Sequence, residues 1–332
     1  MAYIDFVFKV SSLALFFIIG TTSRPTTVPK VFTTVPKVFD VQRYGANGDG
    51  KTNNTKAFTD TWKDACTWDG PSKMYIPNGR FYLGGVSFVG PCTSNISFVI
   101  DGTLLAPPNN NDIKKETWIN FRYIDYLTVS GNGTIDGQGK ESWLLNDCQK
   151  NINCPKFAIN MGFYFVNKSR MEGITSLNSK AGHFSFFSVD HFNITGVNIT
   201  APGDSPNTDG IKMASSSSMQ ISNTHISTGD DCIAMLSGNT NFDIYNVTCG
   251  PGHGISGDSH IQIQNVTLKN IWGTSSNKVA VKFQCSKSFP CKNVHSSDIN
   301  LKHNGVDGPA ITLCENIKGS ATGKMNPPHC LN

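Results

Sequence analysis

Three short polar phrases, each with glycine neighbours, carry the residues of this sequence that are suited to acid–base chemistry. They read Asn-Thr-Asp-Gly at 207–210, Gly-Asp-Asp at 229–231 and Gly-His-Gly at 252–254. Asp209 and Asp230 are 21 residues apart, and Asp230 and His253 are 23 apart. If each interval is one turn of a stacked β-structure, whose strands lie about 4.8 Å apart, these side chains meet on one face.

Carboxyl groups this close together cannot all ionise easily, so one of Asp209, Asp230 and Asp231 should keep its proton at mildly acidic pH. Glycoside hydrolysis uses such a set, because it needs a carboxylic acid for the leaving oxygen and a carboxylate for the nucleophile or water. Asp230 and Asp231 serve one cleft only if the chain bends there, since strand neighbours point to opposite faces. The flanking glycines are expected to let a bulky polymer approach the backbone.

Each phrase also has a simpler interpretation. Asn-Thr-Asp-Gly is often a turn, and Asp230 with Asp231 can be a solvated loop or, with Asp209, a calcium site. His253 between two glycines can be an exposed loop histidine. Because each of the three phrases follows the previous one by about one predicted coil, the catalytic interpretation is favoured. This interpretation needs no metal or cofactor.

The elements that would position these phrases are short strands with a repeat. Beyond residue 95, segments rich in Ile, Val, Phe and Thr recur, and similar phrases begin 23, 27, 23 and 19 residues apart, at Met171, Ile194, Ile221, Ile244 and Ile263. This period predicts an all-β fold, a parallel β-helix with one coil per repeat. An antiparallel sandwich or propeller is less favoured, because hairpin turns every 8–12 residues are missing. A helix over 53–66, with Asn and Thr as N-cap candidates, would cap the N-terminal end.

Composition excludes several classes of protein. The chain has 332 residues, a net charge of +4, 16% charged and 38% hydrophobic residues, which does not fit a disordered chain or a coiled coil. No apolar run after residue 20 is long enough to span a bilayer. The basic excess is too small and scattered to predict nucleic-acid binding.

The N-terminus and the cysteines predict secretion. Residues 1–22 resemble a signal peptide, 23–37 a linker containing the duplicated heptapeptide TTVPKVF, and 38–332 one folded domain. An even number of cysteines, ten, fits disulfide bonds, and nearest-neighbour pairing joins Cys66/Cys92, Cys148/Cys154, Cys232/Cys249, Cys285/Cys291 and Cys314/Cys330. Eight Asn-x-Ser/Thr sequons fit a glycoprotein: Asn53, Asn95, Asn132, Asn167, Asn193, Asn198, Asn246 and Asn265.

At these phrases the sequence resembles the plant polygalacturonases, which are right-handed, single-stranded parallel β-helices that hydrolyse pectin. The resemblance also rests on F-D-V-Q-R-Y-G-A-N-G-D-G-K-T (39–52), G-T-I-D-G-Q-G (133–139) and C-G-P-G-H-G-I-S (249–256). The phrase N-D-C-Q-K-N-I-N-C-P (146–155) is most similar to the pollen-type, exo-acting members. The resemblance covers about residues 38–330.

The resemblance implies an inverting hydrolase of α-1,4-linked galacturonan. Asp230 would be the general acid, Asp209 and Asp231 would activate the water, and His253 would support the protonation of the acid. Asn207 is expected to contact the substrate. The implied protein is an extracellular, cell-wall monomer that acts on polygalacturonate, exo rather than endo, with no nucleic-acid partner and no membrane association after signal cleavage.

One family phrase is missing. The family carries Arg-Ile-Lys on a coil after the Gly-His-Gly loop, where its cations hold the substrate carboxylate, and this sequence has no such triplet. At least one coil is expected to be lost near 254–264, where the 19-residue interval would mark the join. Val279-Ala-Val-Lys282 is the nearest substitute, so Lys282 is a candidate carboxylate ligand or else a solvent-facing strand lysine.

The missing phrase leaves alternatives to an active hydrolase. One is a catalytically impaired relative that binds pectin. Another is a calcium-dependent pectate lyase, which is less favoured because elimination needs a basic residue at the α-proton, whereas the Asp-rich phrases match the hydrolases.

Overall fold

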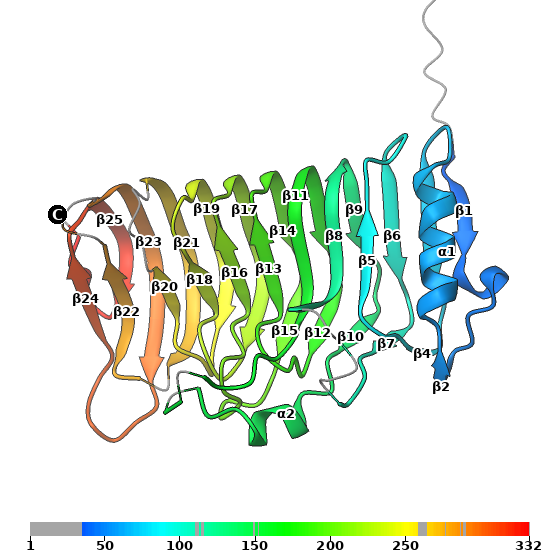
Figure 1. Cartoon of the computed structure of the whole chain (residues 1–332). Helices are drawn as coiled ribbons and strands as arrows, with labels where there is room; N and C mark the ends of the chain where they lie inside the picture. The colour runs from blue at the N-terminus through cyan, green and yellow to red at the C-terminus, as the bar shows by residue number, and fades with distance from the viewer. Residues whose placement is uncertain are drawn as a thin grey trace, which may run out of the picture. The chain divides into compact units, whose positions relative to one another are not determined.

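A computed structural model of the protein describes residues 35–331, except 110–112, 114, 115, 149, 152, 258–263, 276, 286, 288 and 289. These residues form a parallel β-solenoid of about ten turns (Figure 1), which confirms the predicted fold class. Residues 1–34, which contain the predicted signal peptide and most of the predicted linker, lie outside the described residues. No helix in the described ranges is long and apolar enough to cross a membrane.

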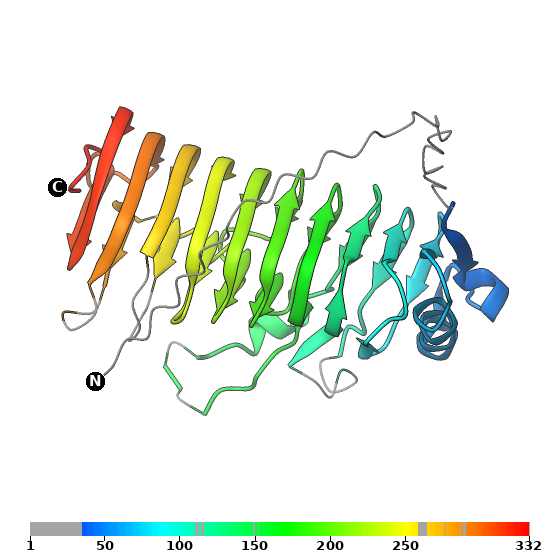
Figure 2. The same ribbon diagram turned by 90° about the horizontal axis from the view of Figure 1, so that it is seen from above.

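The strands stack along faces that run the length of the solenoid (Figure 2). The first, here the β5–β20 face, pairs in the order β5 (Val86–Val89), β8 (Thr117–Asp125), β11 (Ile159–Glu172), β13 (Phe184–Phe187), β16 (Ile211–Ala214), β18 (Ile233–Met235) and β20 (Ile255–Gly257). A second face contains β1 (Lys37–Asp40), β3 (Ser72–Ile76), β6 (Ile96–Ile100), β9 (Leu127–Ser130), the end of β11, β14 (Asp190–Thr195), β17 (Ser217–Ser227), β19 (Thr240–Cys249), β21 (Gln264–Ser275), β23 (Cys291–His303) and β25 (Ile317–Asn326).

The remaining strands are short. A third face contains β2 (Asp49–Asn53), β4 (Arg80–Tyr82), β7 (Thr103–Leu105), β10 (Thr134–Asp136), β12 (Thr175–Leu177) and β15 (Asn198–Thr200). Near the C-terminal end β22 (Val279–Gln284) pairs with β24 (Ile311–Glu315). A 3-10 helix, η1 (Val41–Tyr44), follows β1, and a short helix, α2 (Lys140–Leu144), lies in the connection after β10.

Stacked apolar side chains hold neighbouring coils in register. Alternate residues of each strand point inward, and in register they form rows along the core. One row on the β5–β20 face is aromatic, because Phe121 pairs with Phe163 and Phe163 with Phe186. Their ring centroids are 5.4 and 4.8 Å apart, with interplanar angles of 16° and 5°. Because a slip of one residue would turn the whole row outward, such rows fix the register of the residues on the outer side as well.

Helix α1 (Thr55–Cys66) covers the N-terminal end of the stack, as predicted (Figure 1). Its Phe58 and Trp62 are buried, and the Trp62 ring lies 4.9 Å from that of Phe88. The expected N-cap bond is absent from the described contacts. The side chain of Asn54 instead accepts a bond from the Asn47 amide at 2.7 Å and donates to backbone oxygens of the preceding loop.

Ile263 lies outside the described residues, but the phrase predicted to begin there is out of register from Gln264 onward. Met171, Ile194, Ile221 and Ile244 do stack in successive coils, but Ile244 pairs with Leu268, 24 residues later. The similar phrases misled because alternating buried and exposed residues fit more than one register. Turn asparagines set the true one, since Asn265 donates to Asn241 at 3.1 Å. The 19-residue interval therefore does not mark a join.

All five predicted disulfide bonds form. They join Cys66–Cys92, Cys148–Cys154, Cys232–Cys249, Cys285–Cys291 and Cys314–Cys330. Cys232 directly follows Asp231, so its bond to Cys249 ties the loop that carries the two acids to the following coil.

Candidate active site

The three polar phrases lie at the turns that enter consecutive strands of the β5–β20 face. Ile211, Ile233 and Ile255 pair in register, and Asp209, Asp231 and His253 each stand two residues before one of them. These three residues therefore form the repeating row, at intervals of 22 residues. Asp230 is one residue out of the row.

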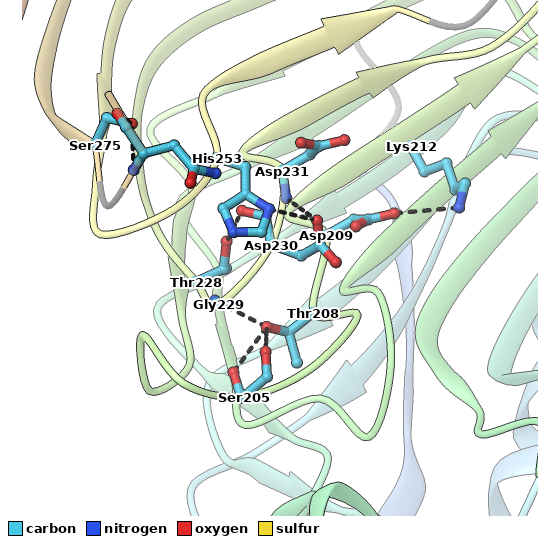
Figure 3. A network of polar contacts seen from close by, with 11 residues as sticks. Ser205, Thr208, Asp209, Lys212, Thr228, Gly229, Asp230, Asp231, His253 and Ser275 are labelled. Atoms are coloured by element: carbon cyan, nitrogen blue, oxygen red, sulfur yellow. Dashed lines mark hydrogen bonds and ion pairs between the residues drawn. The ribbon is translucent and has the colours of Figure 1, made fainter. Parts of the chain in front are cut away.

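A bend at residues 229–230 brings Asp230 to the same side of the molecule as the row (Figure 3). Asp230 Oδ1 lies 3.1 Å from His253 Nδ1 and accepts a 2.9 Å bond from the Asp231 amide. Ligand atoms of Asp230, Asp231 and His253 lie within 4.8 Å of one another. Asp209, from the preceding coil, points into the same cluster in Figure 3. The structure thus brings together all four residues that the sequence singled out.

Glycines shape this loop by letting coils approach each other. A Cβ at Gly229 would overlap the Ser205 carbonyl oxygen, and the Gly229 amide donates to Thr208 Oγ1 at 2.9 Å. A Cβ at Gly210 would similarly crowd the Cys232 carbonyl oxygen. The expectation that these two glycines admit a polymer is therefore wrong, because the space beside them is filled by neighbouring backbone.

Burial controls the protonation of Asp209. Its side chain is only 14% exposed, and this burial, with the nearby charges of Asp230 and Asp231, raises its pKa to about 6. Lys212 opposes the rise, since its Nζ lies 3.1 Å from Asp209 Oδ2. One carboxyl of the cluster therefore holds a proton at mildly acidic pH, but it belongs to Asp209, the expected base, and not to Asp230, the expected acid.

Asp230 and His253 share one proton, and their hydrogen bond decides which of the two residues holds it. Burial alone would raise the pKa of Asp230, but the hydrogen bond and charge of His253 outweigh it, so the pKa falls below the ordinary value. The same hydrogen bond raises the pKa of His253, helped by the charges of the surrounding carboxylates. Without substrate the proton of this pair consequently rests on His253 rather than on Asp230.

A hollow of about 270 Å³ adjoins Asp209. We call it the Asp209 hollow; its polar lining includes Glu116, Lys156, Asn207, Asp209 and Lys212. Asn207 is exposed and has φ 57°, a left-handed conformation that asparagine tolerates better than most residues. Asn207 thus lines the same hollow as Asp209, and its contact with a substrate remains a prediction.

Lys282 lies on β22, and its side chain is exposed. A Cβ at Gly254 would lie 2.8 Å from the Ala280 carbonyl oxygen, so β22 follows the His253 loop as the next coil. Among the described residues no contact joins Lys282 to His253, and its role remains a prediction.

Lys212 is the residue that sequence reasoning missed. Strand alternation was a usable signal, because Ile211 and Met213 point into the core and Lys212 must point outward beside Asp209. Asp230, Asp231 and His253 are compact enough to hold a cation, but calcium prefers six to eight oxygen ligands and an imidazole supplies none. The donor set fits a proton-transfer site better.

Known proteins match this chain in sequence and in fold. The sequence profile described as glycosyl hydrolases family 28 matches residues 66–259 and 257–324. The chain belongs to glycosyl hydrolase family 28. A family relative, an exopolygalacturonase of Platanus acerifolia, is 36% identical over 366 aligned residues, covering 87% of this chain and 97% of the relative. The resemblance to plant polygalacturonases is thereby confirmed.

Two solved structures share the fold of this family 28 chain. The endo-xylogalacturonan hydrolase of Aspergillus tubingensis superposes with a TM-score of 0.66 at 18% identity, over 86% of this chain and 84% of that one. The hyperthermoactive exopolygalacturonase of Thermotoga maritima superposes with a TM-score of 0.59 at 16% identity, over 88% and 92%. At these identities the likeness concerns the fold alone.

Proposed function

We propose that this family 28 chain is an extracellular hydrolase that cleaves α-1,4-galacturonosyl linkages of polygalacturonate, from chain ends and with inversion. The observation that carries the proposal is the cluster of Asp209, Asp230, Asp231 and His253, three acids and an imidazole gathered from three consecutive coils. Of the four, Asp209 lines an open hollow. The relatives named exopolygalacturonase support the substrate and the exo action. Five disulfide bonds fit an oxidising, extracellular environment.

The cluster supports a division of roles. Asp230 delivers a proton to the leaving oxygen, and His253, which holds the shared proton at 3.1 Å in the free enzyme, supplies it. Asp209 and Asp231 take the proton of the attacking water, which requires that they be ionised. Activity then requires that the Asp230–His253 pair hold its proton while Asp209 and Asp231 are ionised. These two requirements give a bell-shaped dependence of kcat/KM on pH.

Inversion and substrate binding follow the family resemblance. An inverting site needs room for a water between acid and base, which carboxyl groups about 6.5–9.5 Å apart provide. Ligand atoms of Asp230 and Asp231 lie within 4.8 Å of each other, so the proposal of inversion is based on the family and not on this separation. Asn207 and Lys282 are proposed contacts of the substrate. Replacing Lys282 by Ala should then weaken galacturonan binding, and unchanged affinity and turnover would remove Lys282 from the site.

A second candidate is a weakened relative that binds polygalacturonate with little turnover. The chain has no Arg-Ile-Lys, and no arginine at all after Arg170. The family profile matches in two pieces that meet at 257–259, and the alignment with the Platanus relative spans 366 positions, more than the 332 residues of this chain. Loss of a bidentate arginine contact costs about 2–5 kcal/mol, roughly 30-fold or more in affinity.

Release of reducing sugar from polygalacturonate separates the two candidates. We expect the wild-type chain to release reducing ends and Asp230→Asn to lose about 10²- to 10⁴-fold in rate, since a positioned acid contributes that much. Binding by both proteins without sugar release from either would refute the hydrolase and support the binder. Equal activity of both proteins would remove Asp230 from the mechanism.

A further inference from the structure

The outer side of the β5–β20 face forms a floor that leads away from Asp209 toward the N-terminal coils. Its register places one outward-facing residue of each coil in a row that ends at Lys212. In order, the row consists of Asn120, Gly162, Ser185 and Lys212. Three coil spacings separate the ends of the row, about 14 Å at 4.8 Å each. This is longer than one sugar ring, so a ligand reaching both ends must be an oligosaccharide.

Arg122 stands on this floor, two residues beyond Asn120 on the same side of β8. Its guanidinium carbon lies 4.2 Å from the centroid of the Tyr164 ring, and the Tyr164 hydroxyl and Thr117 Oγ1 are hydrogen-bonded at 2.6 Å. A Cβ at Gly162 would crowd the Tyr164 ring, so the glycine leaves room for the ring that supports the arginine. The half-buried guanidinium is thus held in place by stacking.

Within the described residues no acid lies within ion-pair distance of Arg122, whereas Arg170 Nε lies 3.7 Å from Glu172 Oε2. The guanidinium carries five N–H donors in a planar fork that matches a carboxylate. A fixed, charged donor set without a counter-ion at a surface hollow is an anion site in chemical terms.

The hollow itself has a second unsatisfied group. It measures about 330 Å³, and we call it the Arg122 hollow; it is lined by Ser87, Glu116, Thr117, Asn120 and Arg122. Asn120 is 2% exposed, its amide nitrogen donates to the Thr117 carbonyl at 2.9 Å, and its Oδ1 has no partner in the described part of the chain. Such an orphan acceptor is rare in folded proteins. A ligand hydroxyl, or a water carried in with it, would satisfy it.

The two hollows are neighbours, because Glu116 lines both. The Glu116 carboxylate opposes anions of high charge, such as phosphates, more strongly than a single carboxylate. A uronic acid residue offers the matching combination of one negative charge and several hydroxyls. It also belongs to a chain that can continue to Asp209.

We propose that the Arg122 hollow is a distal subsite, where Arg122 binds the carboxylate of a uronate residue remote from the cleaved bond. Asn120 accepts a hydrogen bond from the same sugar or its water. The inference rests on the proposed function for its polymer, but it makes binding at this subsite independent of turnover. It also supplies a guanidinium contact to a chain that lacks Arg-Ile-Lys.

Binding of galacturonate oligosaccharides, measured by titration calorimetry at low salt, tests the subsite. Arg122→Met should bind a long oligogalacturonate about 10- to 100-fold more weakly than the wild type, and Arg122→Lys should lose less. With the fully methyl-esterified oligosaccharide, which has no carboxylate to bind, the loss should disappear. Arg170→Met, the matched control on another face, should bind both ligands like the wild type.

Three outcomes would overturn the subsite. The first is an Arg122→Met variant that binds the charged oligosaccharide as well as the wild type does. The second is an equal loss of affinity for the charged and the methyl-esterified oligosaccharide, which would mean that Arg122 only packs on Tyr164. The third is a wild-type protein that binds neither oligosaccharide. Charge-selective binding without sugar release would leave the subsite standing and refute the hydrolase. Thermal unfolding of each variant confirms that the protein compared is folded.

Discussion

Burial and one lysine oppose each other at Asp209, and their balance sets the state of the proposed base. Burial raises the pKa to about 6, while Lys212 at 3.1 Å holds it from rising further. A base works only when ionised, so activity should fall as the pH drops through this pKa. Asp209, whose pKa is raised, should therefore set the acid limb of the pH profile.

Lys212→Met tests this balance. Without the cation the pKa of Asp209 rises, and the acid limb of kcat/KM should move to higher pH. The alkaline limb should move less, because Lys212 is the last of the causes that lower the pKa of Asp230. Lys318→Met, an exposed lysine of β25, is the control and should leave both limbs in place. An unmoved acid limb in Lys212→Met would show that Asp209 is not the group titrating there.

The ionised form of Asp209 should also destabilise the folded protein. Its pKa is raised from 3.8 to about 6 on folding, so the folded chain binds more protons than the unfolded chain between these pH values. The protonated carboxyl therefore stabilises the folded state fully below pH 3.8, and this contribution is lost as the pH rises through about 6. Asp209→Asn should therefore raise the free energy of unfolding at pH 7 by up to about 3 kcal/mol and by much less at pH 4.

Denaturant unfolding at the two pH values measures the effect. Asp243→Asn, an exposed position on β19, should change stability little at either pH. If Asp209→Asn instead destabilises the protein at pH 7, the contacts of the ionised Asp209 carboxylate stabilise the fold by more than its burial costs, which contradicts the prediction.

At the scale of elements, the loop between β17 and β18 decides whether Asp230 and Asp231 can serve one site. The loop bends at 229–230 because Gly229 packs directly on the backbone of the preceding coil. The Cys232–Cys249 bond fixes its far end. The conformation of this loop therefore depends on the close packing of two backbone segments and not on the acidic side chains.

Gly229→Ala should displace this loop. Its Cβ overlaps the Ser205 carbonyl oxygen, so the backbone must shift, and we expect about 1–3 kcal/mol of lost stability together with at least tenfold lower kcat. Gly85→Ala, whose Cβ would meet its nearest neighbour at an ordinary 3.4 Å, serves as the control and should keep both. Wild-type activity in Gly229→Ala would separate the bend from catalysis.

The sequence predicted the elements better than their register. The helix ending at Cys66, the disulfide pairs and the stacked phrases from Met171 to Ile244 required only periodicity and spacing. The repeat at Ile263 failed because turn asparagines, not hydrophobic alternation, set that register. The role of Gly229 and the ion pair of Lys212 required coordinates, because both depend on contacts between coils.

At the scale of the whole molecule, a solenoid tolerates the loss of coils because its contacts are mainly between neighbours. The coils that carry the four site residues are consecutive, so a segment absent near 257–259 need not separate them. The floor from Lys212 to Asn120 lies on the N-terminal side of this point. The proposed subsite is therefore unaffected by such a loss.

The central claim is that the gathered acids hydrolyse a galacturonosyl bond with inversion, and proton NMR during digestion of trigalacturonate tests it most directly. The account predicts that the first product signals belong to the β-anomer at the new reducing end, before mutarotation. An initial α-anomer would contradict inversion, an unsaturated product would indicate elimination, and no product with retained binding would identify a binding protein instead.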